Sequence, residues 1–366
     1  MEVIRPTLLL DETKCQANIR RMADKARRAN VSFRPHFKTH QSHAVGRWFR
    51  EEGVTKSTVS SIRMATYFAA DGWNDITVAF PLNFLEIGEI NRLAASIRLN
   101  LCIVSAASLK KLLEELRNPV HCFIEIDCGY RRTGLEPTDI GGIDEIIKLI
   151  SSSPLLTLAG LLTHAGQSYS CRSGSEILKV HQQTTQVMRK LGARYRREFP
   201  DLVLSIGDTP TCSIATDFSE VGEIRPGNFV FYDIMQRAIG SCSSENIAIA
   251  MACPVVALYP ARNEIVIHGG GVHFSKDFLR REDDGSANFG EVVHLTATGW
   301  ELPSLPVYIK SLSQEHGVLH AQASFIEKLN PGDLLGVLPV HSCMTADAMG
   351  EYFTMNDVRI TMMPKF

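Results

Sequence analysis

Hydrophobic positions along the first two-thirds of the chain alternate between two spacings. Segments such as residues 12–30 and 174–198 carry apolar side chains three or four positions apart, which predicts amphipathic helices. Short apolar runs between them predict strands near residues 32, 58, 77, 102, 124, 160, 204 and 228. Eight strands alternating with helices predict right-handed βαβ units and a closed (β/α)8 TIM-type barrel. An open doubly wound sheet is the alternative, but no GxGxxG motif follows the first strand.

The pattern changes after about residue 240. Strand-like pieces separated by Gly, Pro and Asn replace the long helical segments, which predicts an antiparallel β domain. The N-terminal segment VIRPTLLL also has the pattern of a strand, and we expect it to pair with this second domain. The expected organisation is therefore a barrel over residues 12–240 and a β-rich domain over residues 241–366 together with residues 1–11.

Composition and charge narrow the classes of protein. The 366 residues are 45% hydrophobic and 21% charged, which is typical of a packed globular protein. The net charge of -2 gives no basic surface for a phosphate backbone, so we expect no nucleic-acid partner. The sequence has neither a signal-peptide pattern nor ~20 consecutive apolar residues, so we expect no membrane association. Nine cysteines without CxxC pairing favour a reducing cytoplasm.

Polar side chains gather at the ends of the predicted barrel strands, where barrels carry their active sites. Lys38 follows the first strand, and a barrel mouth with neighbouring cations lowers the pKa of a lysine. A neutral amine of this kind attacks carbonyl groups and forms an imine. A lysine that only reaches from the barrel rim into solvent is the alternative. The other strand-end clusters lie at residues 127–132, 164–169, 207–211 and 225–228.

Two small-residue turns follow the last two predicted strands. The segments GDTPT and RPGN stand where barrels bind phosphate through backbone N–H groups, although ordinary Gly/Pro turns have the same composition. A strand-one lysine, a phosphate cup and no nucleotide motif together point to pyridoxal 5'-phosphate (PLP). The GGG at residues 269–271 is not followed by a helical pattern, so it predicts a turn.

His341, Ser342 and Cys343 follow a strand-like run. On a strand, residues two apart project to the same face, so we expect the imidazole and the thiol side by side. These donors suit Zn²⁺, and two protein ligands leave positions open for water or substrate. A buried histidine beside a free cysteine is the alternative.

Seven motifs in this order resemble those of a known family. They are RPHFKTH, DCGYRRTGL, THAGQSY, GDTPT, EIRPGNFVFYD, SQEHG and PVHSC, and they extend from residue 34 to residue 343. Together they resemble the D-threonine aldolase / D-serine dehydratase family of fold-type III PLP enzymes, which is similar to alanine racemase. The resemblance implies an N-terminal barrel, a C-terminal β domain and a homodimer with shared active sites.

The resemblance also implies roles for matching residues. Lys38 is the implied imine-forming lysine and the base at Cα. The implied cofactor contacts are Arg132, His164 and Tyr169, with Thr209, Gly227 and Asn228 at the phosphate. His341 and Cys343 are the implied metal ligands.

The metal motif separates the branches of this family. Members that resemble D-threonine aldolase tend to carry His-x-Asp, whereas those that resemble D-serine dehydratase carry His-x-Cys and use Zn²⁺. Cys343 therefore favours a PLP- and Zn²⁺-dependent lyase (or one using another divalent ion such as Mn²⁺) that converts D-serine to pyruvate and ammonia. The alternatives are a D-threo-3-hydroxyaspartate dehydratase, a D-threonine aldolase that forms glycine and an aldehyde, an amino acid racemase and a non-catalytic PLP-binding protein.

Overall fold

The computed structural model describes residues 2–365 and divides them into two compact units. One unit contains residues 20–38 and 46–227, and we call it the barrel unit. The other contains residues 2–19, 39–45 and 228–365, and we call it the β unit. The short segment of residues 39–45, which directly follows Lys38, thus belongs to the β unit.

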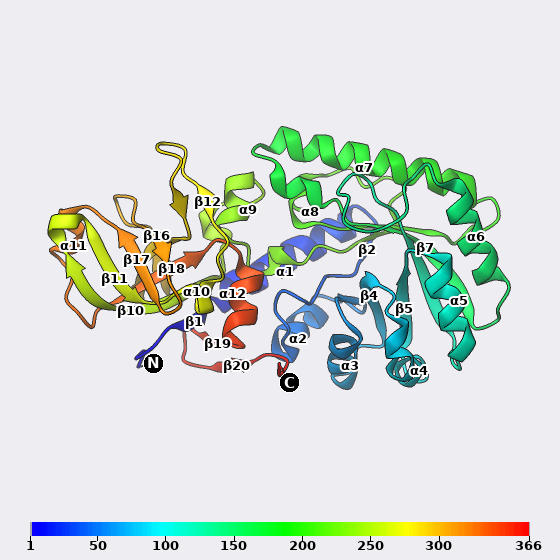
Figure 1. Ribbon diagram of the computed structural model, residues 1–366, viewed down its shortest axis with the longest axis horizontal. Helices are drawn as coiled ribbons and strands as arrows, with labels where there is room; N and C mark the ends of the chain where they lie inside the picture. The colour runs from blue at the N-terminus through cyan, green and yellow to red at the C-terminus, as the bar shows by residue number, and fades with distance from the viewer. Residues whose placement is uncertain (1, 366) are drawn as a thin grey trace. The chain divides into compact units, whose positions relative to one another are not determined.

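Eight parallel strands form the barrel unit, and Figure 1 shows helices α3 to α7 outside them. Sequence neighbours are also neighbours in the sheet, whose order is β2-β9-β8-β7-β6-β5-β4-β3. The strands are β2 (Ser32–Phe33), β3 (Ser57–Val59), β4 (Asp75–Pro81), β5 (Arg98–Ile103), β6 (Val120–Glu125), β7 (Leu156–Thr163), β8 (Val203–Ile206) and β9 (Glu223–Ile224).

The two ends of this sheet meet. His36 forms a parallel bridge with Thr58, the Phe37 N–H donates to the Thr58 carbonyl at 2.8 Å, and the Thr58 N–H donates to Pro35 at 2.9 Å. The expected (β/α)8 barrel is therefore confirmed, and the open doubly wound alternative is excluded. The eighth strand ends at Ile224, so the predicted strand near residue 228 was placed a few residues late.

The barrel helices begin where a small polar residue can cap them. Side chains of Ser61, Ser105, Asp139, Ser173 and Asp208 each accept a hydrogen bond from a first-turn N–H. Such caps satisfy N–H groups that the helix itself leaves without partners. The helices are α1 (Glu12–Arg28, divided between the units), α2 (His43–Glu51, likewise divided), α3 (Ile62–Ala70), α4 (Ile87–Ala94), α5 (Ala106–Glu115), α6 (Ile140–Ser151), α7 (Gly174–Tyr195) and α8 (Thr209–Ile214).

The β unit contains a ten-stranded sheet. Six antiparallel strands close into a ring, because β10 pairs with both β11 and β18 while β17, β16 and β14 complete the circuit. The strands are β1 (Thr7–Leu10), β10 (Ile249–Tyr259), β11 (Glu264–His268), β14 (Gly290–Thr296), β15 (Gly299–Glu301), β16 (Tyr308–Leu312), β17 (His316–His320), β18 (Leu334–Pro339), β19 (Glu351–Thr354) and β20 (Arg359–Thr361), with β12 (Leu279–Arg280) and β13 (Ala287–Asn288) as a separate hairpin.

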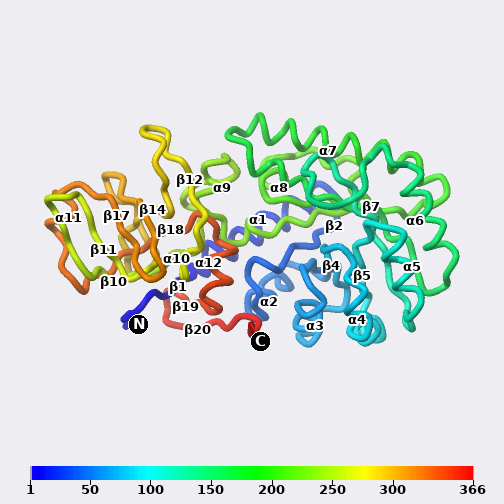
Figure 2. The backbone as a smooth tube through the Cα atoms, in the orientation of Figure 1, coloured from blue at the N-terminus to red at the C-terminus, as the bar shows by residue number. Residues whose placement is uncertain are grey.

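The N-terminal strand pairs as predicted. β1 lies antiparallel to β10 and parallel to β19, and Figure 2 traces the blue N-terminal segment near the red C-terminal one. Leu8, Leu9 and Leu10 are all buried there. Burial of three leucines on both faces explains why this segment reads as a continuous apolar run.

The sequence pattern did not predict four short helices in the β unit. They are α9 (Ile234–Ile239), α10 (Gly271–Phe274), α11 (Ala323–Ile326) and α12 (Ser342–Met349). The predicted strand geometry of His341 and Cys343 is wrong, because β18 ends at Pro339 and α12 begins at Ser342. Within residues 2–365, the structure has no helix that is long and apolar enough to cross a membrane.

Candidate active site

Lys38 stands on a firmly anchored backbone at the end of β2. The preceding residue, Phe37, is fully buried, and its ring centroid lies 5.1 Å from that of Phe49 and 4.8 Å from that of Phe68. The N–H of His36 donates to the Pro226 carbonyl at 2.9 Å. Lys38 itself is exposed. Rigid neighbours and an accessible amine are what a covalent attachment point requires.

Two histidines beside Lys38 are held neutral. Burial, followed by the charge of Lys38, lowers the pKa of His36 well below its usual value and lowers that of His164 to about 3. His164 Nδ1 lies 2.5 Å from the Gly207 carbonyl oxygen, and a carbonyl only accepts, so the ring proton is on Nδ1. His164 therefore presents an uncharged ring with a lone pair at Nε2.

Aromatic side chains surround His164. The ring centroids of Tyr130 and Tyr169 lie 5.8 and 6.2 Å from that of His164, and the guanidinium of Arg132 stacks over Tyr130 at 5.1 Å. Gly166 allows the Tyr130 ring to pack against the backbone, because a Cβ at this position would lie 2.4 Å from that ring. The structure thus brings together four of the sequence-predicted residues, namely Lys38, Arg132, His164 and Tyr169.

A buried ionic network fixes the strand ends beneath this cluster. Arg225 donates from Nε to Ser205 Oγ at 2.7 Å and from Nη2 to the Thr163 carbonyl at 2.5 Å. Glu223 accepts from Ser205 Oγ at 2.7 Å and from Arg34 Nε at 2.6 Å. A fully paired buried network is a rigid support, because breaking any member leaves an uncompensated group.

The predicted phosphate turns occupy the ends of β8 and β9. Thr209 is the first residue of α8, and Asp208 caps that helix by accepting from the Thr211 N–H at 2.7 Å. A Cβ at Gly207 would lie 2.8 Å from Arg225 Cβ, so only glycine fits. Gly227 follows Pro226 in the segment that receives the His36 N–H.

Electrostatics in this cluster fit an anionic cofactor such as PLP. The charges of Lys38, Arg132 and Arg225 all lower the pKa of His36 and of His164, which shows that their fields overlap. Burial raises the pKa of Glu125, a nearby carboxyl, so that its negative charge is disfavoured. The net positive field suits the phosphate and the ring oxygen of PLP.

His341 and Cys343 come together in the β unit despite the wrong prediction of a strand. His341 is the N-cap of α12, and Cys343 lies in its first turn. Asp233 fixes this start, because its Oδ2 accepts from the Ser342 N–H at 2.9 Å and from the Ser342 hydroxyl at 3.1 Å. Burial lowers the pKa of His341, but hydrogen bonds with Asp277 and Cys343 outweigh it and raise the pKa to about 11.

Further polar groups surround this pair. Thr39 Oγ1 lies 3.2 Å from Cys343 Sγ. Asn228 Nδ2 donates to Asp233 Oδ2 at 2.7 Å and to Ser342 Oγ at 2.9 Å, and lies 3.6 Å from Cys343 Sγ. The side chain of Asn228, which the resemblance links to the phosphate, is therefore engaged beside the His–Cys pair.

The pair fits a divalent metal ion. Asp277 Oδ2 lies 3.1 Å from His341 Nδ1, an arrangement that orients the opposite nitrogen, Nε2, as a ligand. A nitrogen and a thiolate sulfur are the donors that Zn²⁺ prefers. The proton that His341 holds without metal must leave on binding, so metal binding here releases protons.

Sequence reasoning missed several of these residues. Thr39, Arg225 and Asp233 stand inside the quoted motifs, so they could have been found from the motif pattern. Asp277 lies 64 residues from His341 in the chain, in a segment that no motif marked. Only the folded chain connects the two.

Comparison with known families identifies the class of protein. Residues 10–234 match the family described as alanine racemase, N-terminal domain, and residues 248–355 match a putative serine dehydratase domain. The chain belongs to this alanine racemase-like family of fold-type III PLP proteins.

Individual relatives of this chain include dehydratases and an aldolase that act on D-amino acids. The D-serine dehydratase of Dictyostelium discoideum is 28% identical over 96% of this chain and 93% of the relative. The D-threo-3-hydroxyaspartate dehydratase of Delftia sp. HT23 is 27% identical over 95% and 93%, and its solved structure covers 100% and 98% with a TM-score of 0.91. A D-threonine aldolase from Filomicrobium marinum, 18% identical over 98% and 94%, shares the fold with a TM-score of 0.82. The expected family and fold are confirmed.

Proposed function

We propose that this chain is a PLP- and divalent-metal-dependent lyase that removes water from a D-3-hydroxy amino acid, with D-serine as the leading substrate. Similarity along nearly the whole chain to a D-serine dehydratase and to a D-threo-3-hydroxyaspartate dehydratase supports it. The observation that carries the proposal is the His341–Cys343 pair oriented by Asp277, in a chain that also places Lys38 among neutral histidines.

Lys38 has two tasks in this proposal. Its Nζ would hold the cofactor, and the same Nζ would remove the Cα proton of the substrate. PLP, when bound, supplies the electron sink that accepts the pair released at Cα. His164, neutral and held by the Gly207 carbonyl, supplies an uncharged ring against the cofactor.

His341 and Cys343 are the proposed metal ligands. A Zn²⁺ ion in this position would act as a Lewis acid on the β-hydroxyl and make it a better leaving group. A solved cysteine-to-alanine variant of the Delftia dehydratase is in the metal-free form, and a histidine two positions earlier has also been replaced by alanine in a solved variant. The same spacing separates His341 and Cys343, which supports the ligand pair.

The chain itself connects the two sets of residues. Thr39 is the residue after Lys38, and consecutive Cα atoms are about 3.8 Å apart. Its hydroxyl contacts the Cys343 sulfur at 3.2 Å. In the proposed reaction Lys38 acts at Cα of the substrate, and the metal pair acts at its β-hydroxyl.

Product analysis tests this function. Purified protein is supplied with PLP and Zn²⁺ and incubated with D-serine, D-threo-3-hydroxyaspartate or D-threonine, with and without a chelator. Chelator-sensitive release of a 2-oxo acid and ammonia is the expected result. Release of glycine and an aldehyde from D-threonine, without 2-oxo acid from the other two, would instead identify an aldolase. Interconversion of the enantiomers without either product would identify a racemase.

Other features stay proposals. We propose Zn²⁺ as the resident metal because of the sulfur ligand, and a reducing cytoplasm because the nine cysteines, most of which are buried, show no disulfide framework in their spacing. Thr209 and Gly227 are the proposed phosphate contacts of the barrel unit. We also propose a homodimer with shared active sites, which sedimentation of the holoprotein can test.

A further inference from the structure

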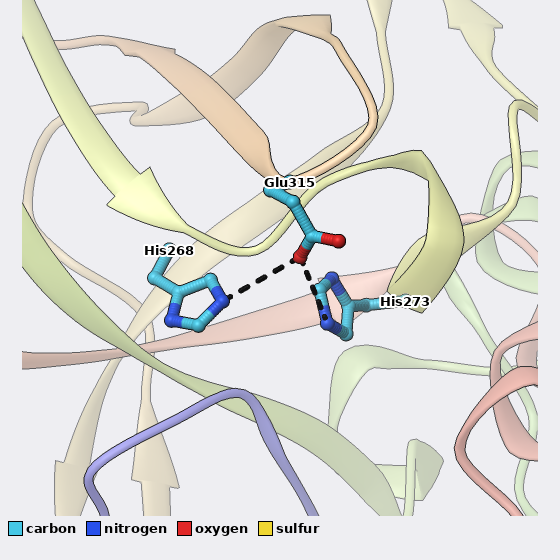
Figure 3. A group of neighbouring side chains, drawn as sticks. All are labelled: His268, His273 and Glu315. Carbon is cyan, nitrogen blue, oxygen red and sulfur yellow. Dashed lines mark ion pairs between the residues drawn. The ribbon is translucent and has the colours of Figure 1, made fainter.

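The β unit contains a second group of side chains with metal-ligand chemistry. His268 Nε2 and His273 Nε2 lie 3.6 and 3.7 Å from Glu315 Oε2, as the dashed lines in Figure 3 show. The three ligand atoms all lie within 4.8 Å of one another. Distances alone therefore do not decide whether this group or the His341–Cys343 pair binds a metal ion.

The hydrogen bond at Nδ1 shows which ring nitrogen of each histidine has a lone pair for a metal. A neutral imidazole has one proton, so the nitrogen that accepts a hydrogen bond leaves the proton on the other nitrogen. The Gly270 N–H donates to His273 Nδ1 at 3.1 Å, and a backbone N–H can only donate. The proton of neutral His273 is therefore on Nε2, the atom that faces Glu315, and no lone pair remains there for a metal.

The Figure 3 group accordingly lies where two loops are joined. Its two loops are joined by backbone bonds, from the Gly269 N–H to the Glu315 carbonyl at 2.9 Å and from the Gly271 N–H to the Ser313 carbonyl at 2.7 Å. Gly270 permits this approach, since a Cβ there would lie 2.3 Å from the Gln314 carbonyl oxygen. The Nε2 N–H of His273, which faces Glu315 Oε2 at 3.7 Å, adds a side-chain contact between these loops.

The opposite arrangement holds at His341. Its Nδ1 lies 3.1 Å from Asp277 Oδ2. The same Oδ2 accepts from the Ser275 hydroxyl, so it is also the acceptor in its contact with His341. The neutral His341 ring consequently has its proton on Nδ1 and its lone pair on Nε2.

Local structure holds Asp277 in this position. The Ser275 hydroxyl donates to Asp277 Oδ2 at 3.0 Å, and the Asp277 N–H donates back to Ser275 Oγ at 3.2 Å. Ser275 adopts a φ of 69°, a conformation that few residues other than glycine adopt. The carboxylate is therefore fixed by a tight turn rather than by chance contact.

We propose that Asp277 is a positioning residue that fixes the tautomer and the ring orientation of His341 for metal binding, and that the His268–His273–Glu315 group does not bind a metal. The inference rests on the proposed function for the His341–Cys343 pair. Carboxylate partners of this kind contribute about 10–100-fold in metal affinity.

The test compares matched substitutions in the full-length protein. Zn²⁺ dissociation constants are measured by competition with a chromogenic chelator for the wild type, Asp277→Ala, Asp277→Asn, His341→Ala and Glu315→Gln. We expect about 10–100-fold weaker binding in Asp277→Ala, a smaller loss in Asp277→Asn, whose amide oxygen still accepts, and wild-type affinity in Glu315→Gln. Saturating Zn²⁺ should restore the kcat of Asp277→Asn but not that of His341→Ala.

The outcomes distinguish the role of Asp277 from the existence of the proposed metal site. Wild-type Zn²⁺ affinity in both Asp277 variants, with binding abolished in His341→Ala, would overturn the role of Asp277 and leave the proposed function intact. Unchanged Zn²⁺ binding in His341→Ala would overturn the proposed metal site itself. Loss of one bound Zn²⁺ in Glu315→Gln would show that the Figure 3 group is a metal site. If Asp277→Ala does not fold, Asp277→Asn, which conserves side-chain volume, decides the question.

Discussion

The hydroxyl of Thr39 lies 3.2 Å from the sulfur of Cys343, although 304 residues separate them in the chain. Thr39 is fully buried and directly follows Lys38, so this contact connects the segment after the barrel lysine to the proposed metal pair. When Cys343 is a thiolate, the Thr39 hydroxyl is the donor in this contact. A hydrogen bond to a charged group contributes about 1.5–3 kcal/mol.

Thr39→Val tests that contact, because valine keeps the shape of threonine and removes the hydroxyl. We expect the Zn²⁺ dissociation constant to rise about tenfold, which corresponds to about 1.4 kcal/mol. Thr39→Ser is the matched control and should keep near-wild-type affinity. Equal Zn²⁺ affinities in the valine variant and the wild type would show that the hydroxyl does not stabilise a thiolate.

Replacement of Lys38 should remove the imine between protein and cofactor. Lys38→Ala is expected to lose the visible absorbance of that imine and about 10²–10⁴-fold or more of the activity, since both attachment and proton transfer depend on this amine. Lys179→Ala, on the exposed surface of α7, is the control. If the absorbance survives in Lys38→Ala and disappears in another lysine variant, that other lysine forms the imine.

Cys343→Asp changes the metal site from a soft to a hard donor. Carboxylate oxygen suits Mn²⁺ and Mg²⁺ better than thiolate does, so metal preference should move toward those ions and dehydration of D-serine should fall. We expect no efficient aldolase activity, because that reaction also needs a base at the β-hydroxyl. Elemental analysis and turnover across Zn²⁺, Mn²⁺ and Mg²⁺ measure both effects. If the variant keeps Zn²⁺ and full dehydratase activity, Cys343 is not a metal ligand.

Gly166 should tolerate no side chain. A Cβ would lie 2.4 Å from the Tyr130 ring, so Gly166→Ala must displace Tyr130 from its place beside His164. We expect weaker PLP binding, measured by titration of the apoprotein, and a modest loss of stability. Gly141→Ala is the control, because nothing lies within 4 Å of its Cβ position on α6, and it should be neutral or slightly stabilising. Equal PLP affinity in the two variants would contradict the packing argument.

Asp208 makes stability depend on pH. Burial raises the pKa of its carboxyl from 3.8 to about 6, despite hydrogen bonds from Thr211 and Ser168. A carboxyl whose pKa is higher in the folded state stabilises the fold fully below pH ~4, and this contribution is lost as pH rises through ~6. Relative to Asp208→Asn, the wild type should lose about 2 kcal/mol of unfolding free energy between pH 4 and pH 7. Urea unfolding at several pH values measures the difference, and a relative gain with rising pH would refute it.

The local pattern of the sequence was sufficient to predict the barrel and to group several strand-end residues. Alternating helical and strand spacings predict parallel strands, and parallel strands place their carboxyl ends on one side. Lys38 and His164 could therefore be assigned to one cluster before any coordinates were known. The β-rich second unit and its pairing with β1 followed from the same rule, because strand pairing buries the apolar run of Leu8–Leu10.

The geometry of the metal pair needed the tertiary structure. Spacing predicted a strand at His341–Cys343, but Asp233 accepts the Ser342 N–H and fixes the start of α12 there instead. Asp277 reaches His341 only because the tight turn at Ser275 aims its carboxylate. A hydrogen bond's direction depends on which atoms face each other after folding, and a sequence pattern records only which residues are available. Folding gives the Nδ1 atoms of His273 and His341 opposite partners, a backbone N–H and a carboxylate oxygen, and this difference carries the proposal for each histidine.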